Sequence, residues 1–219
     1  MVGKNMVNVY VADITDLPDP LENPERMEGL SEERKSKIMR CKRSESRRQR
    51  LGAGMLLREV LNRHGAQEQD IQIGKNGKPE VEGVHFNLSH SYNLVVCVVG
   101  NDVVGCDVER EETTDKSDIA DRFFSENEIL YLNENKEEFV RLWTLKESYV
   151  KMTGEGFGAS LNQFEVCLED EVKVYRNGIP SDCTVKEYEI PGYRLAICAK
   201  EDEFSEEVEY IFLGKNGDS

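Results

Sequence analysis

The chain has 219 residues and a formal net charge of −15, with 43 acidic and 28 basic side chains. Its 38% of hydrophobic and 32% of charged residues are typical of globular proteins, and the longest apolar run, Leu94 to Val99, is too short to span a bilayer. The acidic balance disfavours nucleic acid as a general partner. The six cysteines form no C-x-x-C pair, so we expect a reduced cytoplasmic protein with no disulfide, no thiolate zinc site, no nucleic acid and no membrane partner.

One segment departs from the acidic balance. Between Arg34 and Arg50 the sequence has nine basic residues and one acidic residue, Glu45. A basic patch on an acidic protein favours a local anion site, for example for a phosphate, over a track for a polyanion. A solvated helix face explains the same residues equally well when the segment is taken alone.

The predicted elements alternate between groups of strands and groups of helices. Ser31 is a suitable N-cap for a helical region that reaches about His64, with a break near Ser44. The other patterns predict strands at 7–12, 71–73, 85–91, 94–100 and 103–110, helices at 118–124, 125–132 and 136–152, and strands at 163–168, 172–176, 185–190, 194–200 and 208–213. This order predicts an α+β fold with mainly antiparallel strands, divided into two similar halves, 1–102 and 103–219.

Two carboxylates share one face of the strand predicted at 103–110. Side chains alternate along a strand, so Cys106 and Val108 point to one side while Asp107 and Glu109 point to the other. Neighbouring carboxylates repel each other unless a cation lies between them, and Mg²⁺ is a common solution near phosphates. A solvated acidic edge is the commoner explanation of an Asp-x-Glu pattern alone.

The helix predicted at 136–152 carries two further charged candidates. Glu147 and Lys151 are four residues apart and share a face that differs from the apolar stripe of the helix. The functional interpretation makes Glu147 a third metal carboxylate and Lys151 a phosphate contact. The simpler interpretation is an ordinary exposed ion pair that contributes a few tenths of a kcal/mol.

Two loop regions complete the set of candidates. Ser125 and Glu128 form a capping box, which accounts for both residues, although a general-base role for Glu128 is the alternative. Lys78 and Pro79, followed by the polar segment 87–91, resemble an anion-binding loop, and a turn satisfied by its own side chains is the alternative.

The glycine-rich run at 154–158 follows a predicted helix. The C-terminal end of a helix is the negative end of its dipole, so this run is poorly suited to a phosphate. We interpret it as a C-cap and turn.

The order and spacing of four segments resemble those of a known enzyme family. The segments are FNLSHS at 86–91, GCDVE at 105–109, FFSENE at 123–128 and WTLKESYVKMTGEG at 143–156. In this order they resemble the Sfp-type 4′-phosphopantetheinyl transferases. The resemblance covers essentially the whole chain, including the basic segment and the Gly-Lys-Pro before the FNLSHS strand.

The resemblance implies a fold and a reaction. The fold would be a pseudo-dimer of two α+β halves, monomeric in solution, with the active site in the cleft between the halves. The enzyme would move 4′-phosphopantetheine from coenzyme A to a serine hydroxyl of an apo acyl or peptidyl carrier protein and release adenosine 3′,5′-bisphosphate. The sequence leaves open which carrier protein is modified.

The resemblance also implies roles for the charged residues. Asp107, Glu109 and Glu147 would bind Mg²⁺, or Mn²⁺, at the diphosphate of coenzyme A. Lys151 would neutralise the charge of the diphosphate. Glu128 would be the candidate base for the carrier serine, so Glu128, Glu147 and Lys151 are the expected catalytic residues.

Further residues would bind coenzyme A. Ser89 and His90 would meet its 3′-phosphate region, and Lys78 and Pro79 would lie near the adenine and its phosphate. These four residues come from the segment that the residue types alone mark as an anion-binding loop.

The basic segment would supply the remaining coenzyme contacts. Family members usually carry an arginine here, and the best ungapped register puts Gln49 at its position, with Arg48 and Arg50 on either side. A small shift makes Arg48 the coenzyme contact. Arg34 and Lys37 match positions that approach the 3′-phosphate.

The resemblance places carrier docking on the helices around 111–135. Carrier proteins are typically acidic, yet this region is itself rich in acidic residues. We therefore expect apolar contacts, such as those of Phe124, Ile129 or Leu130, to matter more than charge complementarity.

Two other functions use the same residues. A Mg²⁺-dependent phosphohydrolase or nucleotidyl transferase would act without a carrier protein. A catalytically idle relative would bind carriers or RNA through the basic segment, although the intact carboxylates and the absence of interleaved aromatic residues disfavour it.

Overall fold

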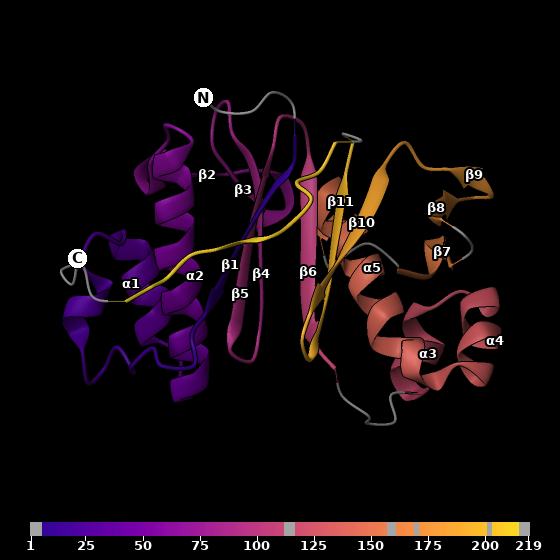
Figure 1. Cartoon of the computed structure of the whole chain (residues 1–219), viewed down its shortest axis with the longest axis horizontal. Helices are drawn as coiled ribbons and strands as arrows, with labels where there is room; N and C mark the ends of the chain where they lie inside the picture. The colour runs from indigo at the N-terminus through magenta and orange to yellow at the C-terminus, as the bar shows by residue number, and fades with distance from the viewer. Residues whose placement is uncertain (1–5, 112–116, 157–160, 169–170, 201–202, 215–219) are drawn as a thin grey trace.

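The computed structural model describes residues 6–111, 117–156, 161–168, 171–200 and 203–214. They form helix, sheet, sheet and helix layers, which Figure 1 shows edge-on. The long helix α2 (Ser44–Arg63) covers the outer face of the first sheet, and α5 (Phe139–Thr153) covers the outer face of the second. The predicted α+β fold class is confirmed.

The two central sheets are mainly antiparallel. The four-stranded sheet has the order β12-β1-β5-β4, and its strands are β1 (Asn8–Asp13), β4 (His85–Ser91), β5 (Leu94–Gly100) and β12 (Glu209–Tyr210). The three-stranded sheet has the order β10-β11-β6, and its strands are β6 (Val104–Arg110), β10 (Thr184–Ile190) and β11 (Tyr193–Ala199).

Both sheets are built from a unit of the same order: a strand, a long helix and a hairpin. The first unit is β1, α2, β4 and β5, and the second is β6, α5, β10 and β11. In each unit the first strand pairs antiparallel with the last one, which lies in the middle of the three. This is the order that two similar halves require, while the division at residue 102 stays a prediction.

The chain returns to the first sheet near its C-terminal end. β12 pairs parallel with β1, so that Tyr10 faces Glu209. Phe204 makes a further parallel bridge to Val7. The segment after β11 therefore crosses from the second sheet to the edge of the first (Figure 1).

Smaller elements surround the layers. The helices are α1 (Glu32–Met39), α3 (Ser117–Phe123) and α4 (Glu126–Glu134), and the 3-10 helices are η1 (Pro24–Met27), η2 (Glu68–Asp70), η3 (Lys75–Gly77), η4 (Lys136–Glu138) and η6 (Leu161–Gln163). The short strands are β2 (Gln72–Ile73), β3 (Pro79–Glu80), β7 (Phe164–Leu168), β8 (Val172–Arg176) and β9 (Ile179–Pro180).

Most sequence patterns specify the correct element, with differences at the ends. Ser31 caps α1 as predicted, because its side chain accepts a hydrogen bond from the backbone N–H of Arg34. The expected break precedes Ser44, where α2 begins. The strand predicted at 208–213 is reduced to the two residues of β12. Within the described ranges no helix is long and apolar enough to span a membrane.

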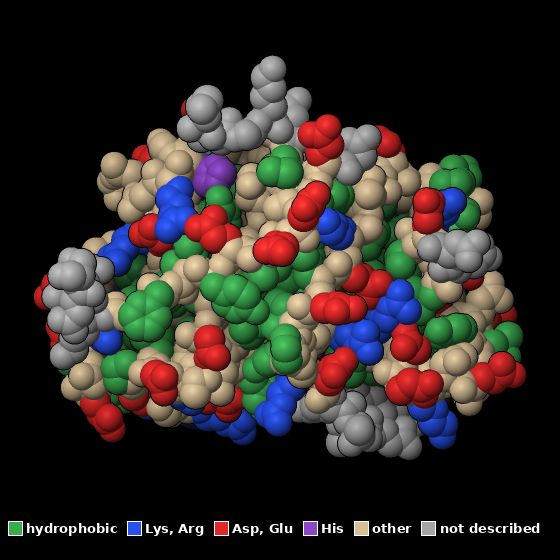
Figure 2. All heavy atoms as spheres, in the orientation of Figure 1, with side chains coloured by type: hydrophobic (Ala, Val, Ile, Leu, Met, Phe, Trp, Pro, Cys, Tyr) green, Lys and Arg blue, Asp and Glu red, His purple; other side chains and the backbone are tan. Residues whose placement is uncertain are grey.

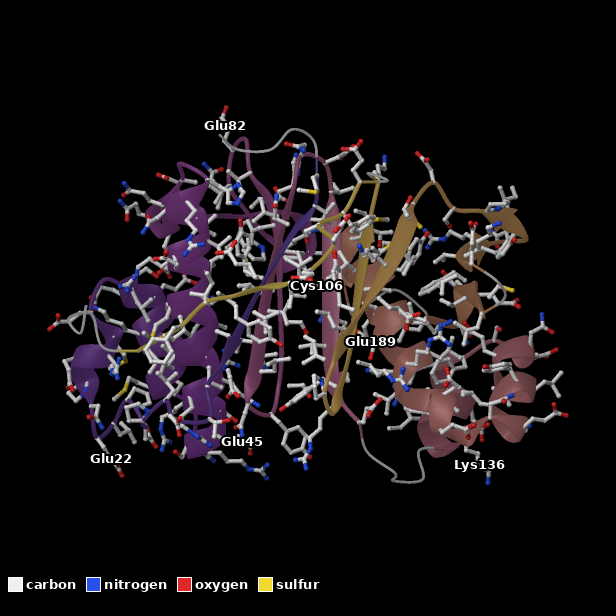
Figure 3. The ribbon with its side chains drawn as sticks, viewed as in Figure 1. Glu22, Glu45, Glu82, Cys106, Lys136 and Glu189 are labelled. Atoms are coloured by element: carbon white, nitrogen blue, oxygen red, sulfur yellow. The ribbon has the colours of Figure 1, made fainter. Side chains whose placement is uncertain are left out.

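Three buried clusters hold the layers together. The first lies between α2 and the four-stranded sheet, and the third lies between α5 and the three-stranded sheet. The second fills the space between the sheets with residues of alternate positions in β1, β5, β6 and β11. Cys106 and Val108 belong to this central cluster, as strand alternation predicts, and Figure 3 labels Cys106 at the centre of the molecule.

α5 contacts β6 closely because Gly105 has no side chain. A Cβ atom at this position would lie 2.2 Å from the backbone nitrogen of Met152 and 2.2 Å from the backbone oxygen of Ser148. Both atoms belong to the helix backbone, which cannot move away as the end of a flexible side chain can. This glycine therefore allows α5 and β6 to lie closer together than a residue with a Cβ atom would.

Gly105→Ala is expected to lower the free energy of unfolding by about 1–3 kcal/mol, because the added methyl group forces α5 away from β6. Urea denaturation measures this change. Asn133→Ala, on the exposed surface of α4, is the control and should change stability by less than about 0.5 kcal/mol. A Gly105→Ala protein as stable as the control would contradict the close contact.

Candidate active site

Polar side chains of β4 join the two central sheets. β4 and β6 are the edge strands of different sheets, and three alternate residues of β4 each accept a hydrogen bond from a backbone N–H of β6. The bonds run from Cys106 N to Asn87 Oδ1 (3.0 Å), from Val108 N to Ser89 Oγ (3.3 Å) and from Arg110 N to Ser91 Oγ (3.1 Å). We call this set the side-chain ladder. It satisfies N–H groups that a neighbouring strand would otherwise satisfy.

The two serines of the side-chain ladder also hold the two carboxylates of β6. Ser89 Oγ donates to Asp107 Oδ1 at 2.8 Å, and Ser91 Oγ donates to Glu109 Oε2 at 2.9 Å. A hydroxyl group can accept one hydrogen bond and donate another, so each serine connects the backbone of β6 to a carboxylate on the same strand. The predicted placement of Asp107 and Glu109 on a common face is confirmed.

Lys151 of α5 completes this group from the opposite side. Its Nζ lies 2.5 Å from Asp107 Oδ1 and 3.1 Å from Ser89 Oγ. Burial alone would lower the pKa of Lys151, but the Asp107 carboxylate and other nearby negative groups outweigh burial and raise it. Lys151 is therefore a retained positive charge beside the carboxylates.

Glu147 lies one helical turn before Lys151 and belongs to the same charged group. Burial raises the pKa of Glu147, the charges of Asp107 and Glu109 raise it further, and Lys151 opposes the change. Asp107 and Glu109 therefore lie close enough to Glu147 for their charges to act on it. Their repulsion favours a cation at this place.

Asp107 has one oxygen without a partner. Its Oδ2 is buried and has no hydrogen bond, while Oδ1 is bound by Ser89 and Lys151. An unsatisfied buried carboxylate oxygen is costly and is a suitable ligand for a hard divalent cation. Among the described residues, however, no three His, Cys, Asp or Glu side chains are already gathered closely enough to hold a metal ion. The donors fit the metal in kind, and their present spacing is wider than in a formed site.

Comparisons with known proteins agree on one family. Residues 103–198 match the model of the 4′-phosphopantetheinyl transferase superfamily. The chain is 32% identical to 4′-phosphopantetheinyl transferase Sfp of Bacillus subtilis (strain 168) over 204 residues, which cover 87% of this chain and 91% of that protein. It is 33% identical to 4′-phosphopantetheinyl transferase ffp of Bacillus subtilis over 90% of this chain and 94% of that one.

The chain belongs to the Sfp-type 4′-phosphopantetheinyl transferases. The resemblance seen in the motifs is confirmed, and the protein is an enzyme of that class. A third relative, the transferase gsp of Aneurinibacillus migulanus, is 36% identical over 64% of this chain and 62% of its own length.

In this transferase the residues predicted to bind coenzyme A occupy different environments. His90 is exposed on β4, close enough to Lys151 and Asp107 for their charges to affect its pKa. Desolvation lowers the pKa of His90, and the charges of Lys151 and Arg50 lower it further. Pro79 is half-buried in β3. The ammonium group of Lys78 is bound by three backbone carbonyl groups, and its predicted place near the adenine and its phosphate stays a prediction.

The basic segment divides into paired and open side chains. Arg34 Nε is 2.5 Å from the buried Glu68, and Lys37, half of whose side chain is exposed, pairs with Glu33 on the same helix at 2.7 Å. Arg48, near the start of α2, is half-buried and donates to the backbone of a neighbouring loop at 3.3 Å.

Gln49 is held by a backbone contact, whereas the side chain of Arg50 is exposed. Gln49 Nε2 donates to the carbonyl of Tyr92 at 3.0 Å and so ties α2 to the turn after β4. Arg50 is exposed and close enough to His90 to affect its pKa. Arg50, to which the sequence analysis assigned no role, is therefore a cation close to His90.

Arg47 is buried and has a structural role that the sequence did not reveal. Its guanidinium binds both carboxylate oxygens of Asp19 and donates to the carbonyls of Cys41 and Lys42 at 2.9 Å each. The hydrogen bonds from Arg47 hold the pKa of Asp19 well below its ordinary value. Arg47 therefore fixes the turn between α1 and α2, which carries the basic segment.

Glu128 is held in the interior by contacts that involve none of Asp107, Glu109 and Glu147. The predicted capping box is confirmed, because Ser125 and Glu128 bond reciprocally. The Glu128 carboxylate also accepts from Lys146 Nζ at 2.8 and 2.7 Å and from Val166 N at 2.8 Å. Only 2% of Glu128 is exposed. Of the two predicted roles, these contacts describe the helix cap and leave no lone pair directed at a substrate.

Lys146 is the partner that the sequence analysis missed. It is fully buried and also donates to the carbonyl of Phe164 at 2.9 Å. Burial lowers its pKa, and Glu128 opposes that change. The ion pair joins α4, α5 and β7. No local pattern reveals it, since Lys146 and Glu128 lie on different helices.

One of the three predicted carrier contacts is wrong. Phe124 is 3% exposed and packs against Phe139 and Trp143 in the cluster under α5. It therefore cannot meet a partner. Leu130 is 65% exposed on α4, and Ile129 is partly buried.

Lys146→Met is expected to lower the free energy of unfolding by about 3–5 kcal/mol, because it leaves the buried Glu128 carboxylate without its counter-charge. The double variant Lys146→Met with Glu128→Gln should be more stable than the single variant. Urea denaturation of both proteins measures this difference. A double variant less stable than Lys146→Met would show that the buried charge is not the cause.

Ser91→Ala removes one step of the side-chain ladder. We expect a loss of about 1–2 kcal/mol in unfolding free energy, because the N–H of Arg110 loses its acceptor. Should Glu109 help to hold Mg²⁺, as proposed below, Ser91→Ala is also expected to raise the Mg²⁺ concentration needed for activity roughly tenfold, because Glu109 loses the hydroxyl that orients it. Ser36→Ala on α1 is the control. An unchanged Mg²⁺ dependence of activity in Ser91→Ala would show that the side-chain ladder does not orient Glu109.

Proposed function

We propose that this transferase moves 4′-phosphopantetheine from coenzyme A to a serine hydroxyl of an apo acyl or peptidyl carrier protein in a Mg²⁺-dependent reaction. The observation that supports it most directly is the Asp107 carboxylate. One of its oxygens is bound by Lys151 and Ser89, and the other is buried and unpartnered. The relatives are named 4′-phosphopantetheinyl transferases, which supports the phosphopantetheine group as the part transferred.

The reaction is a phosphoryl-type transfer. The serine oxygen of the carrier attacks the phosphorus that bears the pantetheine arm, and the hydroxyl proton is released. The bond to the other phosphate breaks, and adenosine 3′,5′-bisphosphate leaves. Such reactions depend on positioning and on neutralising the charge of the phosphates more than on covalent catalysis.

Asp107, Glu109 and Glu147 are the residues that would hold Mg²⁺. The unpartnered oxygen of Asp107 and the raised pKa of Glu147, caused first by burial and then by its acidic neighbours, both fit a cation among these carboxylates. When bound, Mg²⁺ polarises phosphate oxygens and stabilises the leaving group. Mn²⁺ accepts the same oxygen ligands.

Lys151 and the cations around β4 would hold the rest of the coenzyme. Lys151 keeps its positive charge beside Asp107 and would neutralise the diphosphate. His90 and Arg50 are exposed next to this place and would bind the 3′-phosphate region, with Arg48 and Lys37 further along the basic segment. Ser89 takes part through Asp107, since its hydroxyl donates to that carboxylate.

The carrier protein would dock over α4, where Leu130 is exposed. Acidic side chains are spread over the visible face of the molecule, with basic ones among them (Figure 2). A broad electrostatic match with an acidic carrier is thus disfavoured, so an apolar anchor carries more of the expected binding energy.

The test is intact mass spectrometry of a panel of apo carrier proteins incubated with the enzyme, coenzyme A and Mg²⁺. A gain of one phosphopantetheine is expected and should disappear when EDTA removes the metal. Asp107→Ala should lower the rate by at least about a hundredfold, because it removes both a metal ligand and the partner of Lys151.

Lys136→Ala is the matched control, because Lys136 is exposed on η4 at the far side of the second half (Figure 3). It should keep the wild-type rate. Carriers left unmodified across the whole panel, with coenzyme A still bound, would contradict the proposed function. Full activity in EDTA would contradict the proposed Mg²⁺ dependence.

A further inference from the structure

A loop of the first half reaches the C-terminal end of α5. Lys78 Nζ donates to the carbonyl of Lys151 at 2.8 Å and to that of Met152 at 3.3 Å. Asn76 Nδ2 donates to the carbonyl of Gly154 at 2.9 Å. Two side chains from the loop around η3 therefore bind the carbonyl groups with which the helix ends.

The end of a helix needs such partners. The last four carbonyl groups of a helix have no N–H within the helix to bind them, and they form the negative end of its dipole. In α5, Gly154 turns into the left-handed conformation at φ 68°, and its N–H returns to Val150. The carbonyls of Lys151 and Met152 are bound by Lys78 instead, and an ammonium group is favourable at this end.

The same ammonium group contacts the strand on which α5 packs. Lys78 Nζ lies 3.4 Å from the carbonyl of Val104, the first residue of β6. Next to it, Gly105 allows the backbones of α5 and β6 to approach each other. Lys78 thus binds both elements beside the close contact at Gly105.

The side chain of Lys78 is committed to these contacts. It is half-buried, and its three acceptors match the three N–H donors of an ammonium group. Directing this group at a phosphate would break the bonds to α5. Burial lowers its pKa, and the carboxylate of Glu80 opposes that change.

Lys151 connects Lys78 to the Asp107 carboxylate. Lys78 holds the main chain of Lys151, and the side chain of Lys151 binds Asp107 and Ser89. A small displacement of the end of α5 would move the Lys151 ammonium away from Asp107. Displacements of about 1 Å are known to lower rates by about a hundredfold.

We propose that Lys78 is a positioning residue of the transfer reaction: it fixes the C-terminal end of α5 and thereby places Lys151 beside Asp107. Asn76 supports it through Gly154. The inference rests on the proposed function, which needs Lys151 at the diphosphate. It differs from a phosphate-binding role in one measurable respect, the response to the 3′-phosphate of coenzyme A.

The experiment compares coenzyme A with 3′-dephospho-coenzyme A as donors for Lys78→Met. A positioning residue lowers kcat by the same factor with both donors, and we expect a loss of about 10- to 100-fold. The KM for each donor should change less than about threefold. Asn76→Ala, which removes one neutral hydrogen bond, should lower kcat by about two- to fivefold with both donors.

Other patterns would overturn the inference. A higher KM for coenzyme A alone, with 3′-dephospho-coenzyme A unaffected, would make Lys78 a phosphate ligand. Unchanged kcat in both variants would show that the end of α5 needs no partner. Lys136→Met is the charge control and should match the wild type. It removes an exposed lysine on η4, at the opposite end of α5 from Lys78.

A second measurement is independent of activity. Hydrogen–deuterium exchange of the peptide 148–156 should be faster in Lys78→Met than in the wild type, because the last turn of α5 opens more often. It should be unchanged in Lys136→Met. Unchanged exchange in Lys78→Met would refute the contact even if the wild type modified no carrier, so failure of the inference and failure of the proposed function are distinguishable.

Discussion

The free edge of β6 is the constraint on which the rest of the structure depends. β6 must pack α5 on one face and the central cluster on the other, while its edge faces a strand of a different sheet. The side-chain ladder satisfies this edge from Asn87, Ser89 and Ser91. Because hydroxyl groups both accept and donate, the bonds that close the edge also hold Asp107 and Glu109.

This arrangement stores electrostatic repulsion at the site. Asp107, Glu109 and Glu147 lie near one another, and burial together with their mutual charges raises the pKa of Glu147. Lys151 relieves part of the repulsion through Asp107 Oδ1, whereas Oδ2 stays unpartnered. A cation bound among these carboxylates would relieve that repulsion, and the coenzyme phosphates of the proposed function would then meet that cation and Lys151.

The sequence predicts local features well and distant pairings poorly. The alternation in β6 places Asp107 and Glu109 correctly, and the capping box at Ser125 is correct, because both depend on neighbours in the chain. The bond from Lys78 to the carbonyl of Lys151 and the ion pair of Glu128 with Lys146 join elements that are far apart in the sequence. The polar alternation Asn-x-Ser-x-Ser in β4 does contain a signal for the side-chain ladder, since polar residues on the inward face of a strand need partners.

The candidate site combines side chains from β4 with side chains from β6 and α5. The carboxylates and Lys151 come from β6 and α5, and three of these residues, Asp107, Glu109 and Lys151, contact serines of β4. Ser89 orients Asp107, and Lys78 holds the end of α5, and both come from the first half. The geometry of the site therefore reports how the halves pack. Under the proposed function, a coenzyme that contacts both β4 and α5 would stabilise the packing that its own binding requires, so donor binding and the order of α5 would be thermodynamically linked.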